Sequence, residues 1–184
     1  NTARGAALGT DTKMSYEIMH GNYSLLPNET LQRVMHEQLE RLGGVSYSSK
    51  EQKYAETIYK TLVQPSGQIG DQGEIGPYKR SHGYGSTDVG DVSWLIPTGG
   101  ISVATWVPGT AAHSWQAVAT SGTSIGLKGT KLAAKALTAT ALEIYKNPSI
   151  ANEARKELQK NVGPDFNYEA LLGDRKPPLD YRVN

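Results

Sequence analysis

Helical spacing of apolar residues is clearest between residues 28 and 42. One face of this stretch carries Leu31, Val34, Met35, Leu39 and Leu42, the three- and four-residue spacing of an amphipathic helix. Asn28 is a favoured N-cap, and Glu29 places a carboxylate in the first turn, where the helix dipole favours it. Gly43 and Gly44 end the pattern. The sequence therefore predicts a helix here.

Further helices are predicted on both sides of this one. A capping-box pattern at Ser48 begins a helix that we expect to run to about Val63. Residues 125–145 combine apolar residues with many alanines, which predicts a long and largely buried helix. Asn147 as N-cap with Pro148 at the first helical position begins a last helix.

Strand-like patterns occur in three short stretches. Residues 13–19 alternate apolar and polar positions, and residues 92–97 and 100–106 are strand candidates separated by Thr98 and Gly99. Before them, residues 2–9 are rich in small side chains and resemble the end of a helix. Strand candidates set among helices indicate an α/β fold.

The remaining stretches are predicted to be irregular. Residues 66–90 are rich in glycine and have little apolar periodicity, which indicates a loop, and long ordered loops are usually functional. The tail from Gly163, with Pro164, Pro177 and Pro178, is expected to be extended and to lie on the surface.

Composition excludes several classes of protein. The 184 residues include 19 Lys plus Arg and 18 Asp plus Glu, so a formal charge of +1 gives no basic footprint for nucleic acid. The absence of cysteine excludes disulfides, thiolate metal sites and a Cys nucleophile. No apolar run approaches the roughly 20 residues of a membrane helix. The chain opens at Asn1 without a signal-peptide pattern, and we expect a cytoplasmic protein.

The segment 82–94 concentrates candidate chemistry in one glycine-rich loop, where a ligand can approach the backbone closely. Asp88 and Asp91 are three residues apart, so on a helical turn they would share a face and bind a cation or a substrate ammonium. The alternative is that one caps a helix and the other turns the loop. Nucleotide-binding motifs are absent, since Gly83 and Gly85 have no third glycine at position 88.

Four histidines are the remaining candidates for metal chemistry: His20, His36, His82 and His113. His113 follows a predicted strand, where α/β folds place functional side chains. The alternative for His113 is a neutral imidazole that is hydrogen-bonded in a partly buried loop, and the alternative for His20 is a strand-end residue. His36 and His82 are expected at the surface. Serine hydrolysis is disfavoured because no Gly-x-Ser-x-Gly pattern occurs.

Three motifs together resemble a known family. They are residues 85–94 (GSTDVGDVSW), residues 109–116 (GTAAHSWQ) and residues 26–30 (LPNET). In this combination the chain resembles the two-metal amidohydrolase and carboxypeptidase family, nearest to its aminobenzoyl-glutamate utilization protein B branch. The similarity follows the order of the chain from the strand before His20 to the proline tail.

The resemblance implies a fold and a domain division. It implies the C-terminal half of a phosphorylase/hydrolase-like α/β catalytic domain, over residues 23–184. Residues 1–22 would be the last helix and strand of an inserted lid domain that mediates dimerisation.

The resemblance also implies roles for single residues. His113 matches the final metal-ligand histidine of the family. His20 and Asn28 lie in the hinge region that holds the substrate carboxylate, although some relatives have Arg where His20 stands. The residues that match the pocket-lining loop are Gly85, Ser86, Thr87 and Asp88.

One histidine does not assemble a two-metal site, which needs both ions about 3.5 to 4 Å apart to activate water and polarise the amide carbonyl. The resemblance implies two divalent metal ions, zinc or manganese, with the other ligands in an N-terminal half of the same enzyme that precedes Asn1. We therefore expect the isolated chain to be inactive, to associate as a homo-oligomer, and to serve a small-molecule amide substrate of the N-acyl or N-aroyl amino acid type.

Two other functions stay open at the level of the sequence. The chain could be a non-catalytic subunit or interaction module that completes a site in a partner chain. Composition alone also fits an unrelated α/β binding domain, which the loop motif disfavours.

Overall fold

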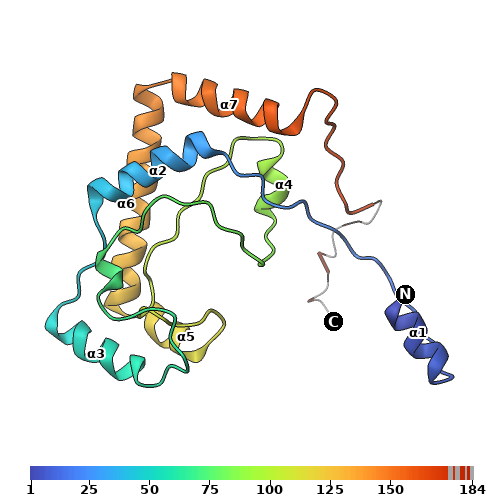
Figure 1. The fold of residues 1–184 in the computed structure, drawn as a ribbon, viewed down its shortest axis with the longest axis horizontal. Coiled ribbons are helices and arrows are strands. Elements are labelled where there is room, and N and C mark those ends of the chain that lie inside the picture. The colour runs from blue at the N-terminus through green and yellow to red at the C-terminus, as the bar shows by residue number, and fades with distance from the viewer. Residues whose placement is uncertain (174–175, 177–178, 181, 183–184) are drawn as a thin grey trace.

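The computed structural model describes residues 1–173, 176, 179–180 and 182, and all of the regular structure within them is helical (Figure 1). A short 3-10 helix covers Asp71–Gly73. The α-helices are α1 (Thr2–Gly9), α2 (Glu29–Leu42), α3 (Ser49–Tyr59), α4 (Val89–Ser93), α5 (Trp115–Ser121), α6 (Ser124–Lys146) and α7 (Ser149–Val162).

The long helix α6 organises the fold, because α2, α5 and α7 all pack against it, and α2 also contacts α7 (Figure 1). Met35 and Leu39 of α2 and Leu158 of α7 supply buried apolar side chains. On α6, Gly129 has no room for a β-carbon, which would overlap the Ala104 carbonyl oxygen. The segment around Ala104 therefore runs directly against α6.

A second core lies where α3 meets the start of α6. Its buried residues are Ala55, Ile58, Val107 and Ile125, and half-buried tyrosines pack around them. Tyr54 also donates a hydrogen bond of 2.8 Å from its hydroxyl to the Ala119 carbonyl. This contact ties α3 to α5.

The predicted helices are present, and their local caps explain where they begin. Asn28 caps α2 by accepting a hydrogen bond from the Leu31 amide at 3.1 Å. Ser48 and Glu51 form the predicted capping box at the start of α3. Three details of the predicted helices were wrong. The helix α3 ends at Tyr59 rather than near Val63, α7 has Pro148 instead of Asn147 at its N-cap, and α6 is not largely buried. Its exposed large apolar residues are Leu127, Leu137, Leu142 and Tyr145.

None of the three strand candidates forms a strand in the described part of the chain. Residues 92–97 were assigned wrongly, since Val92 and Ser93 complete α4 and turns follow. Residues 13–19 and 100–106 have no regular structure. A strand exists only when a neighbour pairs with its backbone, and no other described segment does so here. The α/β class stays a prediction.

Residues 1–20 extend away from the helical body (Figure 1), and α1 buries none of its side chains. The predicted domain division at residue 22 stays a prediction. Pro177 and Pro178, which belong to the predicted extended tail, lie outside the described residues. Within the described residues, each helix is too short or too polar to cross a membrane.

Candidate functional site

Two of the predicted substrate-binding residues, His20 and Asp88, line the same cavity of about 420 Å³. Three parts of the chain form its wall: residues 20–22, the start of α4, and residues 168–172. Both side chains are exposed, and neither has a hydrogen-bond or ion-pair partner among the described residues. Within the described part of the chain, both groups are therefore open to a ligand.

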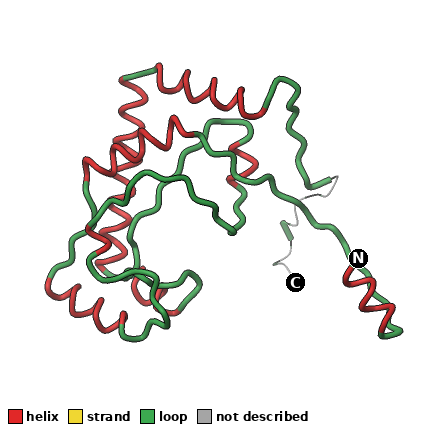
Figure 2. The backbone as a smooth tube through the Cα atoms, in the orientation of Figure 1, coloured by secondary structure: helices red, strands yellow, loops and turns green. Residues whose placement is uncertain are grey.

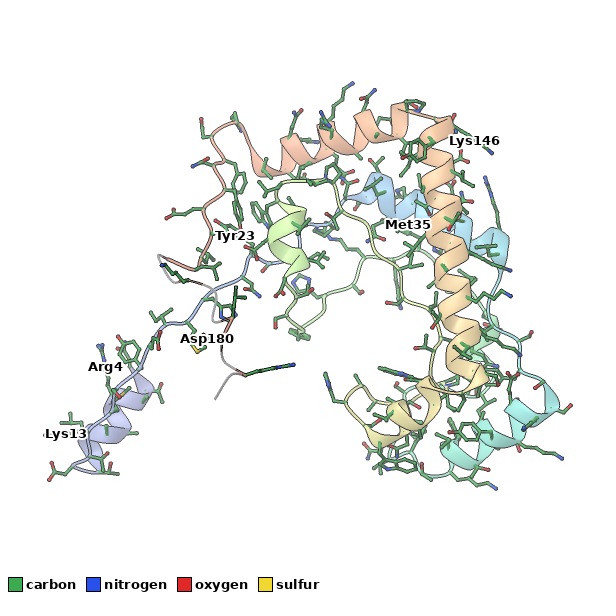
Figure 3. The ribbon with its side chains drawn as sticks, turned by 180° about the vertical axis from the view of Figure 1, so that it is seen from behind. Arg4, Lys13, Tyr23, Met35, Lys146 and Asp180 are labelled. Atoms are coloured by element: carbon green, nitrogen blue, oxygen red, sulfur yellow. The ribbon has the colours of Figure 1, made fainter. Side chains whose placement is uncertain are left out.

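A close approach between α4 and the N-terminal segment creates this cavity. Gly90 is buried against the Tyr23 carbonyl oxygen, which a β-carbon would overlap. The Tyr23 amide donates a hydrogen bond of 3.3 Å to Asp91 Oδ2. Figure 3 labels Tyr23 beside the short helix that contains these residues. The absence of a side chain at Gly90 is what allows the segment to lie so near α4.

Two further side chains of the loop motif hold the same segment. Ser93 is buried, and its hydroxyl accepts a hydrogen bond of 2.8 Å from the Leu26 amide. The Trp94 indole donates to the Ser24 carbonyl at 2.8 Å. The second half of the motif, residues 90–94, therefore docks the chain that carries His20.

Asp91 has a structural role, because both of its carboxylate oxygens accept hydrogen bonds from other parts of the chain. Oδ1 accepts a hydrogen bond of 3.0 Å from the Tyr168 hydroxyl, while Oδ2 accepts from the Tyr23 amide. The hydrogen bond to Asp91 raises the pKa of Tyr168 above its ordinary value, with a further contribution from burial. Asp88 stands at the N-cap position of α4 but makes no capping bond with its side chain. The pair predicted from spacing thus shares one cavity, in which Asp91 is structural and the Asp88 side chain has no partner among the described residues.

Aromatic rings pack on the outer side of this junction. Trp94 and Phe166 have ring centroids 5.1 Å apart, and Tyr23 lies 5.4 Å from Trp94 and 5.5 Å from Tyr168. Sequence reasoning missed Tyr168, because it lies in the tail far from every motif. Only its contact with Asp91 reveals its place at the cavity.

The first half of the loop motif lines a neighbouring cavity. Gly85, Ser86 and Thr87 border a space of about 420 Å³ together with Arg80 and residues 22–25. Asn22 lines this cavity and also the one that contains His20 and Asp88, so the two cavities adjoin. The predicted loop of residues 85–88 is therefore divided between them. His82 is exposed here, as expected.

Asn28 lies apart from these cavities and is 3% exposed. Its amide nitrogen donates to the Ala154 carbonyl at 2.9 Å, and its oxygen caps α2 through the Leu31 amide. Both ends of the side chain are thus used to join α2 to α7. Nothing in this geometry adds to its predicted role in substrate binding.

His113 is exposed and has a φ of 58°, in the left-handed region that strains most side chains. The next residue, Ser114, accepts a hydrogen bond of 3.2 Å from the Ala117 amide as N-cap of α5. The same hydroxyl donates to the Ala111 carbonyl at 2.7 Å. The turn between these bonds holds His113 in its strained conformation. Strain of this kind clusters at functional sites.

The described residues do not by themselves hold a metal ion. They contain no group of three or more His, Asp or Glu side chains in a metal-binding arrangement, and His113 lines neither of the two cavities. A single imidazole falls short of the three or four protein ligands of a zinc centre.

His36 was wrongly expected at the surface. Its side chain is 19% exposed, with Nε2 3.4 Å from Glu40 Oε1, and its ring makes an edge contact with Tyr78 at 5.6 Å. Tyr78 comes from the loop predicted at residues 66–90. The apolar spacing of residues 28–42 does not reveal that a distant loop residue covers His36.

Comparison with known proteins relates the chain to a hydrolase. A p-aminobenzoyl-glutamate hydrolase subunit of Escherichia coli (strain K12) is 32% identical over an alignment of 183 residues, which takes in 86% of this chain and 38% of the relative. This similarity confirms the resemblance indicated by the motifs: the chain is a relative of the aminobenzoyl-glutamate utilization protein B branch. It spans less than half the length of that relative. No protein-family model and no solved structure was found to match.

Proposed function

We propose that this chain is part of a metal-dependent amidohydrolase that cleaves the amide bond of N-acyl or N-aroyl amino acids. The observation that carries the proposal is the 32% identity to a p-aminobenzoyl-glutamate hydrolase subunit over most of the chain. The cavity that His20 and Asp88 both line supports it, because neither side chain has a partner among the residues that the structure describes. The proposed substrate class follows the name of the relative.

In this proposal His113 supplies one ligand to a pair of divalent ions, zinc or manganese. When bound, these ions would supply the chemistry of a two-metal site, which activates water and polarises the amide carbonyl. The exposure of the imidazole, on a backbone with a positive φ, supports this role, since the turn presents it without any partner from the described residues. The other ligands come from the part of the hydrolase that this chain does not cover. His20 and the loop of residues 85–88 bind the substrate.

A non-catalytic interaction module is the second candidate, and it is favoured by the finding that the described residues form no metal-binding group with His113. The two functions differ in one expectation. A half-site gains metal affinity when the rest of the hydrolase is present, through the ligand that His113 supplies, whereas a non-catalytic module contributes no metal ligand.

The test is a chimera in which this chain replaces the matched segment of the E. coli relative. Release of glutamate from p-aminobenzoyl-glutamate is measured after chelation and again after addition of Zn²⁺ or Mn²⁺. We expect metal-dependent turnover by the chimera and none by the isolated 184-residue chain. A folded chimera that is inactive with both metals would contradict the proposed hydrolase. Turnover by the isolated chain would show that no outside ligands are needed.

A further inference from the structure

The tail that follows α7 returns to the N-terminal segment as a loop, as Figure 2 shows. Two hydrogen bonds hold it there. The Gly21 amide donates to the Leu171 carbonyl at 2.9 Å, and the Tyr168 hydroxyl donates to Asp91 Oδ1 at 3.0 Å. The stretch 168–171 is therefore fixed against both the N-terminal segment and α4.

Two adjacent leucines of this tail have exposed side chains. Leu171 is 45% exposed and Leu172 is 53% exposed. Both line the cavity of about 420 Å³ that His20 and Asp88 also line, which we call the His20 cavity. Ligand pockets typically combine apolar walls with a few polar groups. The tail supplies such an apolar wall.

The position of this wall depends on Gly21. A β-carbon at Gly21 would come within 3.3 Å of the Leu171 Cβ and Cδ1 atoms. The missing side chain thus lets the tail lie directly over the N-terminal segment. One flank of Leu171 is covered by this contact, and the wall is held next to the residue that precedes Gly21, which is His20.

Polar side chains form the other part of the lining. His20, Asn22 and Asp88 are exposed and border the same cavity, where they offer hydrogen-bond donors, acceptors and charge. A ligand that fills the cavity therefore needs a polar part and an apolar part. An N-acyl or N-aroyl amino acid has both, because its carboxylates and amide are polar and its acyl or aroyl group is apolar.

We infer that Leu171 and Leu172 are specificity-determining residues that contact the acyl or aroyl group of the substrate, while the polar side of the His20 cavity binds its amino-acid part. This inference rests on the proposed function. It adds to that function by assigning the preference for a large apolar acyl group to the tail.

Equilibrium binding to the metal-free chimera tests the inference apart from turnover. The two ligands are N-benzoyl-glutamate and N-acetyl-glutamate, which share the amino-acid part and differ in the acyl group. Leu172→Ala should weaken binding of the benzoyl ligand on the order of tenfold and that of the acetyl ligand by no more than about twofold, because only the larger group reaches the lost side chain. Leu172→Met has a similar volume and should keep the preference.

The matched control is Leu179→Ala. Leu179 lies further along the same tail and is 86% exposed, but it is not part of the lining of the His20 cavity. This variant should leave the affinity for both ligands unchanged. Equal weakening of both ligands by Leu172→Ala, or an unchanged preference for the benzoyl group, would overturn the inference.

Nuclear magnetic resonance gives a second readout that needs no chimera. In the 184-residue chain, N-benzoyl-glutamate should shift the methyl signals of Leu171 and Leu172 through the ring current of its aryl group, whereas N-acetyl-glutamate should not. Shifts confined to other leucines, or no shifts at millimolar ligand, would contradict the assigned wall. If the chimera does not fold, this measurement decides.

The inference and the proposed function fail in different ways. Benzoyl-selective binding that depends on Leu172, without hydrolysis by the metal-loaded chimera, would refute the proposed activity and leave the apolar wall intact. Metal-dependent hydrolysis whose kcat/KM ratio for the two substrates is unchanged by Leu172→Ala would leave the activity intact and refute the wall.

Discussion

His113 combines exposure with a backbone conformation that an ordinary side chain avoids. A left-handed backbone costs about 1–2 kcal/mol for most L residues, and the surrounding turn maintains it through the two hydrogen bonds of Ser114.

Glu51 differs from His113, because its side chain is buried and paired. It is a buried carboxylate whose charge is fully engaged, by Lys128 and by the Ser48 amide.

Replacement of His113 should separate activity from stability. His113→Gly relieves the backbone strain but also frees the unfolded chain, so the free energy of unfolding should stay within about 1 kcal/mol of the unmodified chain. Hydrolysis by the chimera should be lost, because the imidazole is gone. His113→Asn tolerates the same φ and should also be inactive. Full activity of either variant would exclude His113 as a ligand.

Glu51 should make stability depend on pH in the acid range. The hydrogen bond from Lys128, followed by that from the Ser48 amide, lowers its pKa to about 2, from about 4.3 in an unfolded chain. A lowered pKa stabilises the fold above the unfolded value, and this stability is lost as pH falls from about 4.3 toward 2. Denaturant unfolding between pH 2 and 6 should therefore show a slope that Glu51→Gln reduces.

The matched control for that measurement is Glu56→Gln. Glu56 lies on the same helix but is exposed, and among the described residues its carboxylate accepts a hydrogen bond from the Gln52 side chain alone. This variant should leave the acid slope unchanged. An equal loss of slope in both variants would show that Glu51 has no special part in it.

At the scale of elements, the junction between α4 and residues 21–26 positions the candidate site. Gly90, Ser93 and Trp94 each contact the N-terminal segment, and Gly21 donates a further hydrogen bond of 2.9 Å to the Leu171 carbonyl. Segments from the beginning, middle and end of the chain thus meet at a helix of five residues. Such a short helix depends on these contacts, because isolated helices of this length are unstable in water.

Gly90→Ala should disrupt this junction. The new methyl group would overlap the Tyr23 carbonyl oxygen, so the segment must move away, and overpacking of this kind costs about 1–3 kcal/mol. Denaturant unfolding should show that loss, and Trp94 fluorescence should change because the indole loses its contact with Ser24. Gly83→Ala is the matched control, since a β-carbon there meets nothing within 4 Å. Equal stability of the two variants would contradict the close approach.

At the scale of the whole molecule, α1 stands apart from the helical body. It buries no side chain. Its Arg4 donates a hydrogen bond of 2.8 Å to the hydroxyl of Tyr16, which belongs to the same N-terminal segment. The helices α2, α6 and α7 form the body without it.

Removal of residues 1–12 should leave the free energy of unfolding within about 0.5 kcal/mol, as expected for an exposed segment. Removal of residues 1–24 should destabilise the chain clearly, because it takes away Gly21 and Tyr23, which contact the tail and α4. Thermal or denaturant unfolding of the two truncated chains checks this. A large loss from the shorter deletion would place α1 within the folded body.

The sequence by itself determined where the main helices begin, because helix caps act locally. Asn28 and Ser48 each bond to an amide three residues ahead, and the apolar spacing that follows needs no distant partner. The same locality made the motif of residues 85–94 recognisable, and its family resemblance was confirmed by the relative.

Only the tertiary structure decided that residues 92–97 end a helix instead of forming a strand, and that His20 and Asp88 line one cavity. The contacts responsible join residues at least 67 positions apart, as between Ser93 and Leu26 or Asp91 and Tyr168. Apolar residues alone do not say whether a short segment becomes a strand or the end of a helix, because a strand also needs a neighbour to pair with. Hydrogen bonds between residues close in the chain can be predicted from the sequence. The pairing of strands and the docking of segments depend instead on which distant parts of the chain the fold brings together.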